Sequence, residues 1–298
     1  MLSIIIPFHN EEKNLTLLSD EIGEVLKKHE IAYEVLLIDN GSTDSSWEEA
    51  QTIAKDSTHV RALRLRVIGK GRALSYGVSQ AKGEIIVFMD GDLQDNPDDL
   101  PRFIKKIEEG YDLVNGIRTV RKDNEIIRLY SNFANKVLRF ILHSPFTDIN
   151  CGFKIMRKSV LDEISLYANN FRFLPVAAFY KGFKVGEIPV DNRSRKFGTS
   201  KYRAGKLFIG LIDTFNAYFL YQFSERPLHF FGIIGGIFFL TGLAIAFILT
   251  IERVFFNMLL YRRPALLYGI VLIIVGIQII LTGFIGELIV YINKKTNQ

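Results

Sequence analysis

Cysteine is almost absent from this chain of 298 residues, which contains Cys151 alone. One cysteine excludes an intramolecular disulfide and any metal site built from several cysteines. It agrees with a reducing cytoplasm around the main domain. The sequence also lacks an arginine-rich tract, zinc-finger spacing and an RNA-recognition signature. The formal net charge of +5 therefore favours nucleotide phosphates or an anionic membrane surface over nucleic acid as the partner.

The fingerprints of the two commonest nucleotide-binding folds are missing as well. No P-loop sequence occurs, and the glycine-rich candidate Gly69-Lys70-Gly71 has Leu74 where a dinucleotide-binding fingerprint needs its third glycine. We find no internal repeat and no low-complexity segment. The amino terminus begins at once with a strand-like run, so we expect no signal peptide.

Apolar runs of strand length alternate with segments of helical periodicity in the first part of the chain. The runs predict strands at 2–8, 33–39, 60–67, 84–89 and 112–117. The segments between them predict helices around 15–26, 72–81 and 97–109. Further helices at 125–143 and 173–183 and a strand at 184–190 follow. This alternation predicts an α/β domain with a doubly wound, mostly parallel sheet.

The stretch that organises the chain is Asp90-Gly91-Asp92-Leu93-Gln94, directly after the strand-like run at 84–89. Open α/β sheets bind ligands at the carboxyl ends of their strands. Carboxylates spaced as Asp-x-Asp reach one site there and suit Mg²⁺ or Mn²⁺ bound together with substrate phosphates. A structural alternative is that they cap the helix that Pro97 opens, although Asp95 or Asn96 suffices for that.

Polar residues also follow the first and second predicted strands. Because the carboxyl ends of parallel strands meet at one edge of a sheet, we expect these residues to converge on one cleft. They are His9, Glu11, Asp39, Asn40, Asp90 and Asp92. A basic segment at 193–203 holds five cations in eleven residues. It is either a solvated face or a loop that grips phosphates.

Four motifs, in this order, resemble family 2 glycosyltransferases with the GT-A fold. More narrowly, the chain looks like the polyprenyl-phosphate glycosyltransferases, which include dolichol-phosphate mannose synthases and bacterial enzymes that load sugars onto undecaprenyl phosphate. The motifs are Pro7-Phe8-His9-Asn10-Glu11-Glu12, Ile38-Asp39-Asn40-Gly41-Ser42-Thr43-Asp44, Asp90-Gly91-Asp92-Leu93-Gln94 and Arg195-Lys196-Phe197-Gly198-Thr199-Ser200-Lys201. The resemblance covers nearly the whole chain and implies a Rossmann-like GT-A domain.

The resemblance implies a role for each matching position. The nucleoside pocket would be lined by Pro7, His9, Glu11, Ile38, Asp39 and Asn40. The sugar diphosphate and the Mg²⁺ or Mn²⁺ would be held by Asp90, Gly91 and Asp92, with Gln94 as a further metal ligand. Phosphates of donor or acceptor would be met by Arg118, Arg195 and Lys201. His9 and Asn40 stand where the family commonly has tyrosine and aspartate, which leaves the nucleotide base open, and His9 alternatively packs at the strand end.

The sequence offers no obvious general base near the basic segment. A hydroxyl acceptor needs one, whereas a phosphate monoester, with a second pKa of about 6, is largely a dianion at pH 7 and already a nucleophile. We therefore expect no dedicated catalytic base. Charge that builds on the departing diphosphate would be stabilised by the metal and by arginine or lysine donors. Inversion at the anomeric carbon is implied by the family.

Two long apolar stretches lie near the carboxyl terminus. Residues 230–251 carry no charge and would span about 33 Å as a helix, close to the thickness of a bilayer core. Residues 265–292 contain Glu287 as their only charge; its role stays open. Gly232 and Gly236, and also Gly276, Gly283 and Gly286, permit close helix contacts and possible oligomers. Residues 203–224 predict an amphipathic helix lying on the membrane.

These observations predict a GT-A catalytic domain at 1–202, an interfacial region at 203–229, a transmembrane hairpin at 230–292 and a cytoplasmic tail at 293–298. The predicted enzyme transfers one sugar, first of all glucose from UDP-glucose, to undecaprenyl phosphate on the cytoplasmic face of the inner membrane. GDP-mannose is the alternative donor. A processive synthase is less favoured because its Gln-x-x-Arg-Trp motif is missing, and a silent membrane scaffold because the motifs are intact. Two spans with no polar path between them make a transporter improbable.

Overall fold

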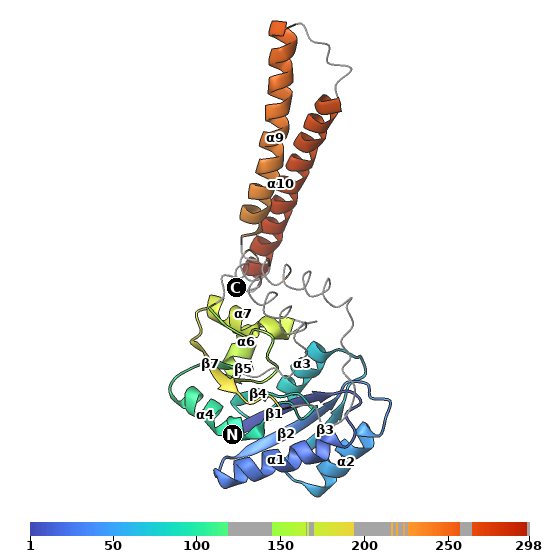
Figure 1. Ribbon diagram of the computed structural model, residues 1–298, viewed down its shortest axis with the longest axis vertical. Helices are drawn as coiled ribbons and strands as arrows, with labels where there is room; N and C mark the ends of the chain where they lie inside the picture. The colour runs from blue at the N-terminus through green and yellow to red at the C-terminus, as the bar shows by residue number, and fades with distance from the viewer. Residues whose placement is uncertain are drawn as a thin grey trace. The chain divides into compact units, whose positions relative to one another are not determined.

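The computed structural model describes residues 1–118, 145–164, 166, 170–193, 216, 219, 223, 226–256 and 264–296 (Figure 1). The predicted helix at 125–143, Arg195, Lys201 and nearly all of the predicted amphipathic helix lie outside these residues. Contacts divide the chain into Met1–Ala217 and Tyr218–Gln298, called unit 1 and unit 2 here. The domain boundaries expected from the sequence stay predictions.

The described part of unit 1 is built on a seven-stranded sheet with the order β3-β2-β1-β4-β6-β5-β7. The strands are β1 (Leu2–Phe8), β2 (Tyr33–Asp39), β3 (Val60–Arg64), β4 (Ile85–Phe88), β5 (Leu113–Arg118), β6 (Lys154–Arg157) and β7 (Val185–Val190). All neighbouring pairs are parallel except those of β6, which runs antiparallel to both β4 and β5. The prediction of a mostly parallel α/β sheet is confirmed.

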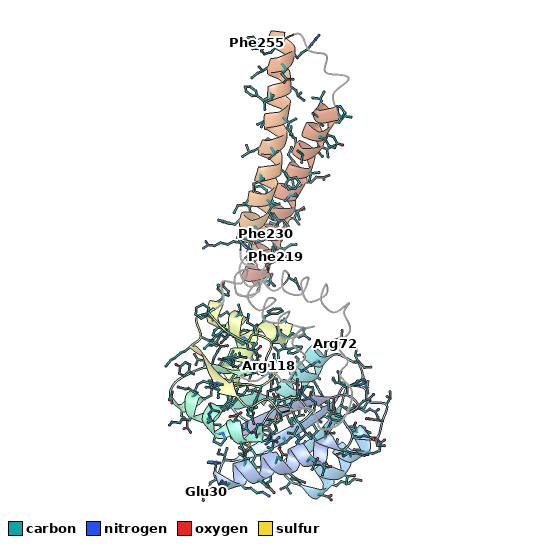
Figure 2. All side chains as sticks on the ribbon, viewed as in Figure 1. Glu30, Arg72, Arg118, Phe219, Phe230 and Phe255 are labelled. Atoms are coloured by element: carbon teal, nitrogen blue, oxygen red, sulfur yellow. The ribbon has the colours of Figure 1, made fainter. Side chains whose placement is uncertain are left out.

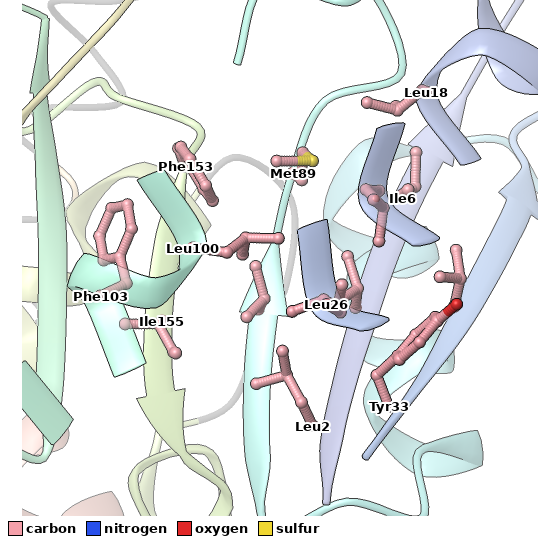
Figure 3. Close-up of a cluster of buried hydrophobic side chains, with 14 of the residues drawn as sticks. Leu2, Ile6, Leu18, Leu26, Tyr33, Met89, Leu100, Phe103, Phe153 and Ile155 are labelled. Atoms are coloured by element: carbon pink, nitrogen blue, oxygen red, sulfur yellow. The ribbon is translucent and has the colours of Figure 1, made fainter. Parts of the chain in front are cut away.

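Helices cover both faces of this sheet, as the mostly apolar strand β1 near its centre requires. Leu2, Ile6 and their alternate neighbours on β1 join a buried cluster with α1 (Asn14–Lys28) and α4 (Leu100–Glu108). Figure 3 shows part of this cluster. On the opposite face, α3 (Lys70–Gln80) approaches so closely that a Cβ on Gly77 would lie 2.4 Å from Ile5. The continuous apolar run of β1 is thus explained by burial on both sides.

The short elements differ from the sequence prediction mainly at their ends. The 3₁₀ turn η1 (Pro97–Asp99) precedes α4, and Asn96 accepts the Asp98 N–H at 3.1 Å to cap it. Capping is therefore done by Asn96, which leaves Asp90 and Asp92 to another role. α2 (Ser46–Asp56) follows β2, and α7 (Leu174–Tyr180) is shorter than predicted. Two short elements, α6 (Lys158–Glu163) and η2 (Asn170–Phe173), were not predicted from the sequence.

Unit 2 contains two helices, α9 (Pro227–Phe256) and α10 (Pro264–Thr296), that are long and apolar enough to cross a membrane. They lie side by side (Figure 1). A Cβ on Gly235 would lie 2.7 Å from the carbonyl oxygen of Gly276, so this glycine pair sets the helix spacing. Gly232 and Gly236 have open space instead, and this motif does not form the contact between α9 and α10.

Glu287 contacts the beginning of the other helix of the hairpin. Its Oε2 accepts the backbone N–H of Leu228 at 3.2 Å. This N–H belongs to the first turn of α9, whose amides have no acceptor within the helix. A carboxylate at a helix amino terminus is also favoured by the helix dipole. Glu287 therefore acts as a cap that α10 supplies to α9.

Candidate active site

Two of the predicted motifs form one connected turn structure at the end of β1 and β2. Asn10 takes a left-handed backbone conformation with φ 56°, and its side-chain oxygen accepts the Thr43 N–H at 2.8 Å. The Asn10 N–H donates to Ser42 Oγ at 3.1 Å, and the Glu11 N–H donates to Ser46 Oγ at 2.8 Å. The loops that follow β1 and β2 are thereby held against one another.

Asp39 is completely buried at the end of β2. Its Oδ1 accepts the Ser42 N–H at 2.8 Å, and its Oδ2 lies 3.0 Å from Arg64 Nε. The Arg64 guanidinium lies over the ring of Trp47, 5.3 Å from its centroid. Asp39 therefore shapes the turn after β2 and orients an exposed cation beside it.

The other residues predicted for this pocket lie at the same edge of the sheet. Pro7 and Ile38 are buried and face each other in the register of β1 and β2. His9 follows β1 and is half-buried. The side-chain oxygen of Asn40 accepts the Gly69 N–H at 2.6 Å and so ties the turn after β2 to the start of α3. Contact of these residues with a nucleoside stays a prediction.

Asp90 lies just beyond β4 and pairs with Lys70, a residue that sequence reasoning did not assign. The Lys70 Nζ is 2.5 Å from Asp90 Oδ1, and the Asp90 N–H donates to Asp95 Oδ2 at 3.2 Å. Burial alone would raise the pKa of Asp90, but the charge of Lys70, with those of Arg118 and Lys154, lowers this pKa below its usual value. Asp90 is thus held as a carboxylate.

Glycine residues give the loop of Asp90 its close packing. A Cβ on Gly152 would lie 2.9 Å from Asp90 Oδ2, so only glycine fits against this carboxylate without a shift. A Cβ on Gly91 would lie 3.3 Å from the Cβ of Phe8. The loop therefore packs directly on the end of β1, which brings the first and third motifs together as the sequence predicts.

Asp92 and Gln94 follow in the same turn. Asp92 is only 8% exposed, and its Oδ1 accepts the Gln94 N–H at 3.2 Å. Leu93 between them has a φ of 61°. Burial, and then the charge of Asp90, raises the pKa of the neighbouring Asp95 to about 7. The turn is therefore crowded with carboxylates, an arrangement that a cation would relieve.

The donor set of this turn fits a hard divalent metal. Asp90 and Asp92 supply carboxylate oxygens and Gln94 an amide oxygen, the ligands that Mg²⁺ and Mn²⁺ accept alongside substrate phosphates. Within the described residues, three or more His, Cys, Asp or Glu side chains do not gather into a metal-binding group. The set fits a metal that takes its remaining ligands from substrate and water rather than from a protein cage.

Arg118, labelled in Figure 2, ends β5. It is held by Asp148, thirty residues further along the chain. Its Nε and Nη2 donate to the two oxygens of Asp148 at 2.8 and 3.0 Å. Burial would lower the pKa of Arg118, but the Asp148 carboxylate raises it above its usual value. Arg118 is thus a fixed cation, and Asp148 is a site residue to which the sequence analysis gave no role.

A pocket of about 700 Å³ lies along α3, next to Lys70. It is lined by Arg72, Ser75, Tyr76 and Ser79 on one face of the helix, together with Ile68 and Leu166. Arg72 is labelled in Figure 2. Its lining includes Gly69 and Gly71, the chain neighbours of Lys70, but not Lys70 itself or the carboxylates of the Asp90 loop.

Comparison with known proteins agrees with this geometry. Residues 3–165 match the family described as "Glycosyl transferase family 2". The chain is 30% identical to the dodecaprenyl-phosphate galacturonate synthase of Rhizobium johnstonii, over 97% of this chain and 87% of that protein. It is 28% identical to the undecaprenyl-phosphate 4-deoxy-4-formamido-L-arabinose transferase of Photorhabdus laumondii, over 97% and 88%.

Solved structures support the fold. Glucosyl-3-phosphoglycerate synthase from Mycobacterium tuberculosis, in complex with Mn²⁺ and UDP-glucose, superposes with a TM-score of 0.57 at 20% identity, covering 76% of this chain and 81% of that one. The same enzyme with UDP alone gives a TM-score of 0.58, covering 74% and 79%. Together with the matched residues and the geometry of the Asp90 loop, these likenesses show that the chain belongs to glycosyl transferase family 2 and is a glycosyltransferase.

Proposed function

We propose that this enzyme transfers one sugar from a nucleotide-sugar donor to a polyprenyl phosphate at the cytoplasmic face of the membrane. One observation carries the proposal. The carboxyl ends of β1, β2 and β4 bring three motifs to one edge of the sheet, in a chain that continues into two helices able to span a membrane. The curated relatives, which span nearly all of this chain, are named as polyprenyl-phosphate sugar transferases.

The donor would occupy the edge of the sheet after β1, β2 and β4. The nucleoside would lie among Pro7, His9, Glu11, Ile38, Asp39 and Asn40, with the diphosphate near Asp90 and Gly91. Asp92 and Gln94 would hold a divalent metal with Asp90, and when bound this metal would neutralise charge on the diphosphate leaving group. Arg118, fixed by Asp148, would present a cation to the phosphates, as would Arg195 and Lys201.

The nucleophile in this proposal is the phosphate of the lipid. It is largely a dianion at pH 7 and attacks the anomeric carbon without giving up a proton. The chain's own task is then to place two anions in line and to hold cations where charge develops. Lys70, which pairs with Asp90 at 2.5 Å, adds a cation to that set.

The fold does not identify the sugar, which has to be determined by assay. UDP-glucose is the first donor expected from the sequence, yet the relatives are named for galacturonate and for 4-deoxy-4-formamido-L-arabinose. A donor panel therefore needs UDP-linked forms of these two sugars beside UDP-glucose and GDP-mannose. A uridine donor is supported by fold neighbours solved with UDP.

Turnover by detergent-purified full-length protein tests the proposal. The assay contains undecaprenyl phosphate, Mn²⁺ or Mg²⁺ and one donor at a time, and it measures release of the nucleoside diphosphate. Asp92→Ala should abolish release, whereas Asp56→Ala, at an exposed position that ends α2, should leave it unchanged. No release with any donor from folded protein contradicts the proposal. In that case, metal-dependent UDP binding would indicate an enzyme with a different acceptor, whereas no such binding would indicate a silent scaffold.

A further inference from the structure

A lysine occupies the centre of the sheet, where an apolar side chain would be expected. Lys154 begins β6 and is only 1% exposed. In the register of the sheet it lies opposite Phe88 on β4 and opposite Asn115 on β5. Burying an ammonium group is costly unless hydrogen bonds replace those it makes to water. The position therefore calls for specific partners.

The partners are backbone carbonyl groups of the segment just before β6, residues 148–153, which we call the Asp148 loop. The Lys154 Nζ donates to the carbonyl oxygen of Cys151 and, at 3.4 Å, to that of Ile149. Both bonds are buried. An ammonium has three donors and no acceptor, so it is suited to gather several carbonyl oxygens that point into a core. Lys154 thus ties down a loop that belongs to neither a helix nor a strand.

The Asp148 loop supports two groups of the candidate active site. Asp148 holds the Arg118 guanidinium through two hydrogen bonds of 2.8 and 3.0 Å. Four residues later, Gly152 packs against the carboxylate of Asp90. The side-chain amide of Asn115 donates to the Asp148 carbonyl at 2.9 Å and fixes the start of the loop. A shift of the loop would therefore move a cation and a carboxylate of the site together.

We propose that Lys154 is a positioning residue of this glycosyltransferase, whose buried ammonium holds the Asp148 loop so that Arg118 and Asp90 meet the donor's diphosphate. The proposal rests on the proposed function for the identity of that ligand. Lys154 itself does not contact substrate; it acts through Cys151 and Ile149. A methionine would fill similar space but would leave both carbonyl oxygens without their donor, and such groups relax toward other partners.

The test compares Lys154→Met with Lys158→Met in the full-length protein. Lys158 is a matched control because its Nζ also donates to a backbone carbonyl, that of Ala81 at 2.9 Å, away from the Asp148 loop. Affinity for UDP in the presence of Mn²⁺ is read from the fluorescence of Trp47, the only tryptophan of the sequence. Its ring lies under the guanidinium of Arg64, which pairs with Asp39. Turnover with the active donor gives kcat and KM.

We expect Lys154→Met to fold and to weaken Mn²⁺-dependent UDP binding and kcat by about 10-fold or more, as loss of supporting residues around metal sites does. Lys154→Arg, which keeps cationic donors, should recover part of both. For Lys158→Met, the UDP affinity and kcat should both stay within about 2-fold of the wild-type values. UDP binding and turnover at the wild-type level in folded Lys154→Met would overturn the proposal.

Two further outcomes are decisive. If Lys154→Met does not fold, Lys154→Gln is measured instead, since it keeps one donor group but does not reach both carbonyls. Binding and turnover of folded Lys154→Gln at the wild-type level overturn the proposal, and a loss of about 3-fold or more supports it. Failure of the wild type to turn over any donor counts against the proposed function alone, because the UDP-binding comparison still decides the role of Lys154.

Discussion

Replacing Lys154 by methionine should remove a pH-dependent part of the protein's stability. Burial lowers the pKa of Lys154 from 10.5 to about 8. The unfolded chain, whose Lys154 keeps the ordinary value, therefore binds more protons than the folded chain between pH 8 and 10.5. Stability rises with pH wherever the unfolded state binds more protons. The wild type should gain stability from this residue as the pH rises through that window, and the methionine variant should not.

The size of the effect follows from the shift. The difference between 10.5 and about 8 is about 2.5 in pKa, and a difference of one corresponds to about 1.4 kcal/mol, so the burial penalty at pH 7 is about 3–4 kcal/mol. Methionine removes this penalty but leaves two buried carbonyls without Lys154, each costing about 1–3 kcal/mol. At pH 7 the two effects nearly offset each other. Near pH 10 the variant should be the less stable protein.

Denaturant unfolding in detergent, followed by Trp47 fluorescence between pH 7 and 10, measures this difference. Lys158→Met gives the pH dependence of the other groups and serves as the baseline. The free energy of unfolding of wild type minus that of Lys154→Met should increase by about 2–3 kcal/mol across the range. A difference that stays constant with pH would refute the assignment of Lys154 as a buried, destabilised cation.

Three other substitutions test separate contacts. Gly152→Ala would place a methyl group 2.9 Å from Asp90 Oδ2, so Mn²⁺-dependent UDP affinity should fall by about 10-fold; unchanged affinity in a titration would mean that Asp90 is not held there. Arg193→Ala would remove hydrogen bonds to Glu21 and Asn96 and lower the free energy of unfolding by about 1–3 kcal/mol. The melting temperature should fall by several degrees. An unchanged melting temperature would show that these bonds do not stabilise the protein. Glu287→Ala would leave the Leu228 N–H of α9 without its acceptor and lower the stability in detergent by about 1 kcal/mol. Glu287→Gln should lose less stability. Equal stability of the wild type and both variants would contradict the role of Glu287 as a cap of α9.

The strands of the central sheet could be predicted from the sequence because burial on both faces leaves a plain signal. β1 and β2 begin and end at the predicted residues, since each contains an uninterrupted run of buried apolar residues, 4–6 in β1 and 35–38 in β2. The apolar helices α9 and α10 were equally plain, although both begin earlier than predicted, each at a proline. Proline fits the first turn of a helix, where its missing N–H is not needed.

The partners of the site residues could not be predicted, because they depend on strand direction and register. β6 is four residues long and starts with a lysine, so its pattern indicates neither a buried strand nor an antiparallel one. Its direction is what brings the Asp148 loop to the same edge as Asp90. Lys70 and Asp90, twenty residues apart, meet only because α3 packs across β1. Sequence spacing alone carries no record of such contacts.

Arg195 and Lys201, in the fourth motif, stay predicted phosphate-binding residues because they lie outside the described residues. In the described residues just before that motif, the Arg193 N–H donates to the carbonyl oxygen of Gln94 at 2.9 Å, and Asn192 pairs with Asp95. The segment that leads into the basic residues is thus bonded directly to the turn of Asp92 and Gln94. This contact is a physical reason to expect the two motifs to act on the same ligand.

The mass of the lipid product shows whether the enzyme adds a single sugar to undecaprenyl phosphate. Purified full-length enzyme is incubated with undecaprenyl phosphate, Mn²⁺ and the donor that gives turnover, and the lipid is analysed by mass spectrometry. We expect undecaprenyl phosphate enlarged by one sugar residue and by no more, and no such product from Asp92→Ala. A lipid bearing several sugars, a polymer free of lipid, or unmodified undecaprenyl phosphate with every donor would contradict it.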